Sequence, residues 1–259
     1  KAVGREFIKI LNARRMIPVV DEQRFPEAPC RLTIAFASDL HIRKSMNVDA
    51  IAAIIQSTNA DALILGGDIA DSEPDARRML RAISALSFPR GKYAVCGNND
   101  IEAFGSAKRF GLALADEGIK LLENEGILIP ESNAFLAGAA DAKYGKPNPR
   151  RAFANAPERA YRILASHYPL EEMLECAPDL MLSGHTHGGQ FNLFGITPYT
   201  FGYEKKLRLA HIAGTEKRGR TRILVSRGVG ASKMPLRIGV RSEVHRIVLG
   251  GEMMENNPR

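Results

Sequence analysis

Five short motifs place side chains that commonly bind metals directly after apolar, strand-like segments of the sequence. The side chains are carboxylates, imidazoles and one carboxamide: Asp39, His41, Asp68, Asn98, His167, His185 and His187. Ligand sites in open α/β sheets lie beyond the carboxyl ends of the strands. We therefore expect these seven side chains to converge on one site.

The residue types indicate which chemistry such a site supports. Asp39 and His41 are two residues apart, so both side chains leave the same face if the backbone is extended, and His185 and His187 repeat this spacing. Carboxylates, imidazoles and an amide, without thiolates, form a mixed oxygen and nitrogen set that suits Mn, Fe or Zn. Two such ions can activate water and hold the oxygens of an in-line phosphoryl displacement. A single Asp-x-His or His-x-His motif is more often a turn or a satisfied polar pair, but the ordered series of five favours a two-metal site.

Alternating strands and helices position the first three motifs. Apolar, β-rich runs predict strands over 32–38, 61–65 and 92–96, and helical periodicity predicts helices over 48–57 and 74–86. A strand–helix alternation with a repeat near 30 residues indicates parallel strands joined by right-handed crossovers.

The second half of the chain reads as a further set of short strands. These are expected over 121–122, 126–129, 134–139, 161–165, 180–182, 222–226 and 244–249. No proline- or serine-rich linker separates the halves, so we expect a single domain over 32–250 with two sheets. Residues 1–31 are expected to form a lead-in with a short helix over 7–16, and residues 251–259 a tail.

Composition limits the class of protein. The chain has 259 residues, 45% hydrophobic and 25% charged, which excludes a disordered tail, a collagen-like repeat and a disulfide scaffold. No apolar run approaches the roughly 20 residues of a membrane-spanning helix. Cys30, Cys96 and Cys176 form no metal or disulfide pattern, and we expect free thiols in a reducing compartment, hence a cytoplasmic location. The sequence begins at Lys1 rather than Met, so the native N-terminus stays open.

The net charge of +7 is concentrated, and one source follows the last ligand motif. Five of the 17 aromatic residues fall within 191–203, and residues 203–222 hold seven Lys and Arg against two Glu. One interpretation is a lip that selects substrate, in which Lys205 and Lys206 meet an anionic headgroup, a lipid surface or single-stranded nucleic acid. The other is a sheet-packing insertion with solvated charges. Arg227, after a late strand, either reaches the phosphate or is an ordinary surface arginine.

The ordered motifs DLH, GD, GN, a lone His and GHTH resemble the calcineurin-like metallophosphoesterase superfamily over about 32–249. The resemblance implies an α/β fold, a four-layer αββα sandwich of two mixed sheets, with two divalent metal ions. It implies Mn as the first choice of metal and Fe or Zn as alternatives. It assigns one ion to Asp39, His41 and His187 and the other to Asn98, His167 and His185. Asp68 would bridge the two ions.

One position departs from the family pattern. The motif GNHD or GNHE has a His thought to act as general acid or phosphate contact, and here Asn99 occupies that position. An amide can donate a hydrogen bond to a phosphate oxygen, but it cannot deliver a proton near neutral pH. We therefore expect either a good leaving group or a different proton donor, with Asp71 and Asp100 as candidates.

The function expected is hydrolysis of a phosphodiester or pyrophosphate by in-line attack of a hydroxide that bridges the two ions. Asn98 and Asn99 would stabilise the developing charge. The segments GHTHGGQ and PLRIGVRSE resemble a bacterial branch that includes membrane-associated enzymes acting on lipid-linked substrates. We expect a monomer with a nucleotide- or lipid-linked substrate and peripheral membrane contact. The alternatives are a nuclease, with nucleic acid the less favoured partner, and a binding scaffold of the same fold with weak catalysis.

Overall fold

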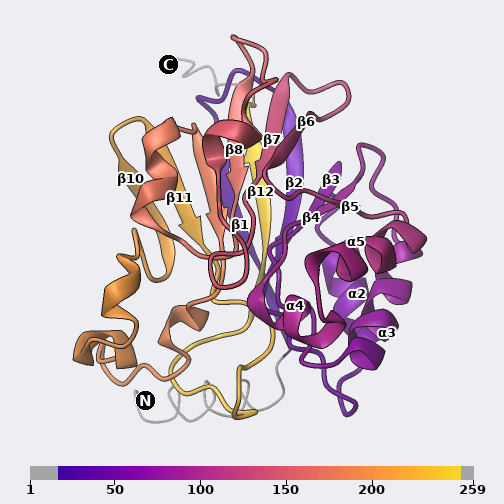
Figure 1. Ribbon diagram of the computed structural model, residues 1–259, viewed down its shortest axis with the longest axis vertical. Coiled ribbons are helices and arrows are strands. Elements are labelled where there is room, and N and C mark those ends of the chain that lie inside the picture. The colour runs from indigo at the N-terminus through magenta and orange to yellow at the C-terminus, as the bar shows by residue number, and fades with distance from the viewer. Residues whose placement is uncertain (1–16, 252–259) are drawn as a thin grey trace, which may run out of the picture.

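The computed structural model describes residues 17–251 and folds them around two six-stranded sheets (Figure 1). The first sheet has the order β1 (Val19–Phe25), β12 (Glu243–Leu249), β2 (Leu32–Ala37), β3 (Ala62–Leu65), β4 (Lys92–Ala94) and β5 (Lys120–Leu121). The second has the order β10 (Gly214–Arg218), β11 (Thr221–Val225), β9 (Leu180–Ser183), β8 (Tyr161–Ala165), β7 (Ala134–Gly138) and β6 (Glu125–Leu128). Each sheet contains both parallel and antiparallel pairs, which confirms the expectation of two mixed sheets.

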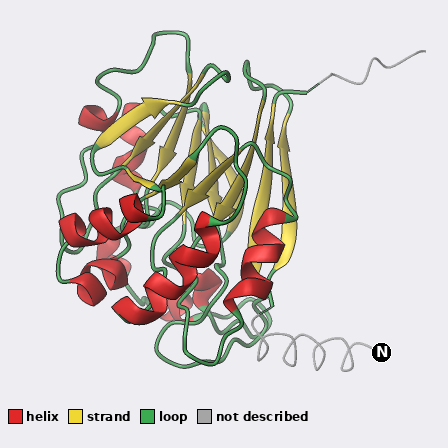
Figure 2. Ribbon diagram, turned by 90° about the vertical axis from the view of Figure 1, so that its right-hand side faces the viewer, coloured by secondary structure: helices red, strands yellow, loops and turns green. Residues whose placement is uncertain are grey.

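Helices cover the outer faces of both sheets. The first sheet is covered by α2 (Val48–Gln56), α3 (Glu73–Ser84), α4 (Asn98–Phe104) and α5 (Ala107–Asp116), which lie together on one side of the strands in Figure 1. The second is covered by α6 (Pro149–Ala152) and the 3-10 turn η1 (Glu171–Cys176). Figure 2, turned by 90°, shows the strands gathered above most of the helices. The layers are therefore helix, sheet, sheet and helix, as the resemblance implies.

Strand β2 shows why its sequence is apolar throughout. Ile34 and Phe36 pack into the core between the two sheets, whereas Ala35 and Ala37 pack against the helices on the outer face. A strand covered on both faces shows no polar alternation. The large side chains fill the space between the sheets, and the small ones let the helices approach.

The two helices predicted from periodicity are present, and their bounds differ from the prediction by at most two residues. Asn47 caps α2 by accepting a hydrogen bond from the Ala50 backbone N–H (3.1 Å). Pro74 lies in the first turn of α3, where its missing N–H costs no intrahelical bond.

The structure also contains elements that the sequence analysis does not predict. Strand β1 lies inside the segment expected to be a lead-in and pairs in parallel with β12 along its whole length. Residues 19–25 therefore belong to the first sheet. Helices α4 and α5, and strand β10, are likewise unexpected. The helix predicted over 7–16 lies outside the described residues.

A buried charge cluster joins β1 to β12. His245 lies with Nδ1 3.2 Å from an oxygen of Asp21 and Nε2 3.3 Å from an oxygen of Glu243. Burial disfavours the imidazolium, but the two carboxylates outweigh it and raise the pKa of His245. His245 is buried, stacks on Phe36 with ring centroids 6.2 Å apart and belongs to neither group of candidate metal ligands among the described residues, so it is a packing residue, in line with expectation.

The structure bears on two expectations drawn from composition, which concern membrane-spanning helices and cysteines. Within residues 17–251, no helix combines the length and the apolar character needed to cross a bilayer. All three cysteines are free thiols.

Candidate metal centre

The loops that follow β2, β3, β8 and β9 bring five of the seven predicted ligands into two overlapping groups. One group is Asp39, His41 and His187, and the other is Asp39, Asp68 and His167; within each, the ligand atoms lie within 4.8 Å of one another. All five residues are buried. Strand ends from both sheets contribute, so the two-sheet architecture is what assembles the site.

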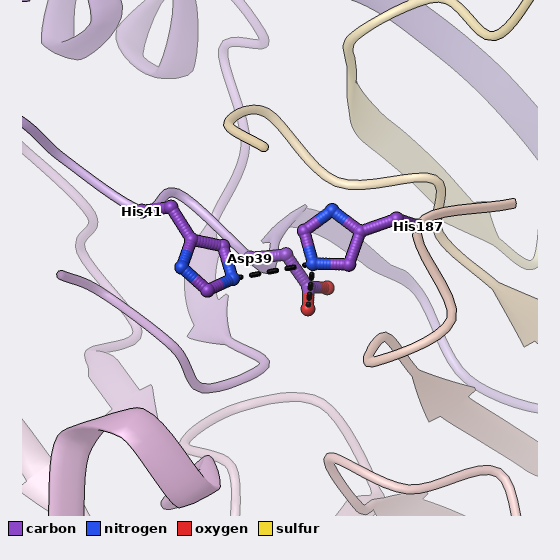
Figure 3. A group of neighbouring side chains, drawn as sticks. All are labelled: Asp39, His41 and His187. Atoms are coloured by element: carbon purple, nitrogen blue, oxygen red, sulfur yellow. Dashed lines mark hydrogen bonds and ion pairs between the residues drawn. The ribbon is translucent and has the colours of Figure 1, made fainter. Parts of the chain in front are cut away.

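The first group holds its three side chains in direct contact. In Figure 3 dashed lines join one ring nitrogen of His187 to the His41 ring and to the Asp39 carboxylate. His187 Nε2 is 3.2 Å from His41 Nε2 and 3.4 Å from Asp39 Oδ1. These are the three residues that the resemblance assigns to one ion.

Asp68 faces both groups. Its Oδ2 lies 3.4 Å from Nε2 of His41 and 3.4 Å from Nε2 of His167. The carboxylate thus stands between an imidazole of each set, which is the placement that a bridging ligand requires.

The protonation of His167 tests whether a cation fits here. His167 Nδ1 lies 2.8 Å from the Gly66 carbonyl oxygen and must donate to it, so Nε2 carries the lone pair or a second proton. Nε2 is buried without a hydrogen-bond partner among the described residues and faces Asp68. Burial disfavours the imidazolium, but Asp68 and Asp39 outweigh it and raise the pKa of His167 to about 10. A field that holds an extra proton at this atom also favours a metal cation.

A hydrogen-bond relay orients the two imidazoles of the first group. His41 Nδ1 lies 2.7 Å from Asp71 Oδ1 and donates to it, so Nε2 carries a lone pair. Arg237, completely buried, donates from its guanidinium to His187 Nδ1 (3.0 Å). Arginine has no acceptor, so the proton of His187 lies on Nε2 and points at Asp39 and His41, where a cation would replace it.

The backbone at these ligands is strained. Five ligands have positive φ values, between 39° and 68°, a region that non-glycine residues rarely adopt: Asp39, His41, Asp68, His185 and His187. The expectation that the DxH and HxH pairs sit on extended backbone is therefore wrong. The side chains converge through left-handed turns, and each such residue costs about 1 kcal/mol or more, which the surrounding packing must offset.

Comparison with known proteins agrees with this geometry. A family model described as calcineurin-like phosphoesterase matches residues 32–189. The chain belongs to this family. It is 32% identical to the phosphodiesterase YaeI of Escherichia coli over 87% of this chain and 84% of that protein. It is 30% identical to the uncharacterized protein YpbG of Bacillus subtilis, over 85% of this chain and 82% of that protein.

A bovine relative named as a transmembrane protein with a metallophosphoesterase domain is 27% identical over 93% of this chain and 59% of that protein. Family membership, together with the ligand groups, makes this chain a metal-dependent phosphoester hydrolase.

Two predicted ligands of this phosphoesterase bond elsewhere in the structure. His185 Nε2 lies 3.1 Å from Glu204 Oε2, and its ring stacks on Tyr168 with centroids 3.7 Å apart. The Tyr168 hydroxyl donates to Asn98 Oδ1 (3.1 Å). The Glu204 contact leaves His185 Nδ1 as the atom available to a metal, and the His185 ring lies beside that of His167, a member of the second group, with centroids 5.2 Å apart.

Asn99 bonds to the Asp68 carboxylate, and Asp100 bonds to the backbone around Asp68. Asn99 donates to Asp68 twice, from its backbone N–H to Oδ1 (2.9 Å) and from Nδ2 to Oδ2 (2.7 Å). Asp100 is completely buried and accepts from the backbone N–H groups of Gly97, Asp68 and Ile69. Burial and the charge of Asp68 raise the pKa of Asp100 to about 7. Both oxygens of Asp100 face the backbone, which gives this residue a positioning role.

The remaining predicted site residues are Arg227, Lys205 and Lys206. Arg227 pairs with the buried Glu243 (2.9 Å), and Lys205 and Lys206 are exposed on the surface. None of the three lines the cavity of about 820 Å³ above the ligands. The arginines of the basic segment pair with carboxylates, as in the contact of Arg222 with Glu27 (2.9 Å). Because of these pairs, and because β10 is a strand of the second sheet, part of the segment 203–222 matches the sheet-packing interpretation.

Three residues support the ligand histidines, and the sequence analysis singles out only one of them, Asp71. Asp71 stands three residues after a ligand, a spacing that marks it as a candidate partner. Glu204 is an acid at the head of a basic run, and Arg237 is a lone charge in the apolar stretch PLRIGV. A charge that differs from its neighbours is the only sequence feature that marks Glu204 and Arg237, because each contacts its histidine only in the folded chain.

Proposed function

We propose that this phosphoesterase binds two divalent ions, with Mn²⁺ as the favoured metal, and hydrolyses a phosphodiester or a pyrophosphate. One ion would be held by Asp39, His41 and His187, the other by Asn98, His167 and His185, and Asp68 would bridge them. The observation that carries the proposal is the bare Nε2 of His167, buried and aimed at Asp68 at 3.4 Å.

The donor set supports the choice of metal. It contains hard carboxylate and amide oxygens together with imidazole nitrogens and no thiolate, a combination that accepts Mn, Fe or Zn. When bound, two such ions would supply an activated water and neutralise charge on the phosphoryl oxygens.

The chain's own residues would fix the geometry of the reaction. Asp71 orients His41, Arg237 orients His187, and Glu204 orients His185 through the atom that does not face the metal. Outer partners of this kind set ring orientation and ligand basicity. Tyr168, Asn98 and Asn99 line the cavity beside these ligands, where a substrate phosphate would enter.

Asn99 restricts the substrate. Its amide nitrogen donates to Asp68 and carries no proton that it can transfer, so this position cannot assist a poor leaving group. A pyrophosphate or a diester with a stable leaving group, nucleotide- or lipid-linked, needs no such help. The 32% identity to a protein named as a phosphodiesterase supports a diester.

The test is hydrolysis of bis(p-nitrophenyl) phosphate by the metal-free chain after titration with Mn²⁺. We expect activity that rises with Mn²⁺, disappears with chelator, and falls at least 100-fold in Asp68→Asn. A circular dichroism spectrum of the variant that matches the wild type separates lost catalysis from lost folding. Hydrolysis that is unchanged by chelator, or by Asp68→Asn, would overturn the proposal.

A further inference from the structure

A cluster of exposed apolar side chains borders the cavity of the candidate metal centre. We name it the apolar rim: Leu193, Phe194, Ile196, Phe201 and Tyr203. Phe194 is 98% exposed and Phe201 82% exposed. Of the twelve large hydrophobic residues that are exposed between residues 17 and 251, these five fall within eleven consecutive positions. Exposed apolar residues that are scattered singly need no explanation, but a cluster of this kind marks an interaction surface.

Hydrogen-bonded turns hold these side chains outward. Leu193 and Ile196 exchange two backbone hydrogen bonds of 3.0 Å, which places Phe194 and Gly195 at the tip of a tight turn. Both tip residues have positive φ, 55° and 91°. A short 3-10 turn, η3 (Pro198–Phe201), follows and presents Phe201. The exposure is therefore a consequence of defined backbone geometry.

The rim forms one continuous surface. Four of its residues, Leu193, Ile196, Phe201 and Tyr203, line a single groove of about 730 Å³ together with Phe191. In Figure 1 this segment is the orange chain with helical turns below β10. Tyr203 and Phe191 also line the cavity above the ligands, so the groove and that cavity share a wall.

Free positive charge flanks the rim. Lys205 and Lys206 follow Tyr203 after one intervening residue, Glu204, and are exposed, and Lys233 lines the cavity above the ligands. In the part of the chain that the structure describes, no carboxylate pairs with any of these three lysines. The arginines farther along the same basic segment do have carboxylate partners, such as Arg220 with Asp179. Unpaired positive charge therefore lies next to the apolar rim.

We propose that the apolar rim docks on a bilayer surface that contains anionic lipids. Leu, Ile and Phe side chains would enter the boundary between headgroups and acyl chains, and the three lysines would meet lipid phosphates at the anionic surface. Charge decides against a second copy of the chain, since apposed rims would bring like-charged lysines together. Leu193 and Ile196 offer no stacking face to nucleic acid bases, unlike the three aromatic residues of the rim, so the mixed aliphatic and aromatic surface favours lipid.

Docking in this way would place the cavity mouth at the level of lipid headgroups. The shared wall of groove and cavity then lets an amphiphilic phosphoester keep its apolar part in the groove while its phosphate enters the cavity. The docking itself does not depend on catalysis, and it goes beyond the proposed function.

The experiment is sedimentation of the full chain with vesicles of phosphatidylcholine alone and with 30% phosphatidylglycerol. We expect binding to the anionic vesicles at least tenfold above the neutral ones, and a loss of binding of at least tenfold in the double variant Phe194→Ser/Phe201→Ser. Leu112→Ser is the matched control, because Leu112 is 60% exposed on α5 and outside the rim. The single variant Phe194→Ser, which lies outside the groove, should hydrolyse bis(p-nitrophenyl) phosphate as the wild type does, which separates this proposal from the proposed function.

Three results would overturn the proposal. The first is the absence of binding to anionic vesicles by the wild type, and the second is binding by the double variant equal to that of Leu112→Ser. The third is a wild-type dimer in light scattering that becomes monomeric in the double variant, which would assign the rim to a second copy. Unchanged melting temperatures in all variants confirm that folding is intact.

Discussion

Removal of the Asp71 carboxylate should weaken metal binding without unfolding the chain. Asp71 Oδ1 accepts from His41 Nδ1 at 2.7 Å, and the His41 side chain is completely buried whereas that of Asp71 is 44% exposed. Loss of such an outer partner costs about 10- to 100-fold in metal affinity, or about 1.4 to 2.7 kcal/mol. Asp71→Asn keeps an acceptor oxygen and loses a partly screened charge, so we expect about tenfold.

Asp71→Ala should be the more severe of the two variants. It leaves the buried Nδ1–H of His41 without an acceptor, which adds the cost of an unsatisfied polar group, about 1 to 3 kcal/mol. We therefore expect a loss near 100-fold.

The assay is competition for Mn²⁺ between the protein and a fluorescent chelator, at fixed pH and ionic strength. Asp75→Asn is the matched control, since Asp75 also lies in a partly exposed ion pair, with Arg78 on α3, away from the ligands. Affinities within twofold of wild type in both Asp71 variants would refute the reasoning that this carboxylate orients a metal ligand.

Three further predictions concern Gly184, Asn99 and His245. A Cβ on Gly184 would overlap the Asp39 carboxylate, so Gly184→Ala should lower Mn²⁺ affinity at least tenfold, and unchanged affinity in the chelator assay would contradict the close approach. Asn99→His should raise turnover of alkyl phosphodiesters by about 10² or more and leave aryl esters within threefold, because only the former need a proton donor; equal gains on both would argue against this. The raised pKa of His245 means that its ion pairs stabilise the fold fully below the unfolded pKa near 6.5, and that this contribution is lost as pH rises through the folded pKa. His245→Gln should therefore lose more stability in urea melts at pH 5.5 than at pH 9.5, and an equal loss at both would refute the pairing.

Sequence patterns predict the elements that carry the ligands because those elements are the most apolar. Strands β2, β3, β8 and β9 are buried on both faces, and the ligand motifs follow them directly. The sequence analysis does not predict strand β1, because this strand is polar and lies at a sheet edge. Its sequence is VVDEQRF, and only Phe25 is buried. The sequence analysis does not predict helix α4 either. This helix begins at Asn98, inside a ligand motif, and its polar first turn shows no helical periodicity.

Local sequence cannot predict how the ligands are held. The left-handed backbone at Asp39 and His187 is imposed by packing around the turns, and neither residue type signals it. Arg237 reaches His187 across 50 residues of sequence, and Glu204 reaches His185 across 19. These partners become visible only when the two sheets bring their loops together.

The central claim is that the seven predicted ligands hold two ions, and the number of ions bound per chain tests it most directly. We predict that isothermal titration of the metal-free chain with Mn²⁺, checked by elemental analysis after dialysis, gives two ions per chain. His167→Ala and His187→Ala, from opposite sets, should each retain one. A stoichiometry of one in the wild type, or of two in both variants, would contradict the account.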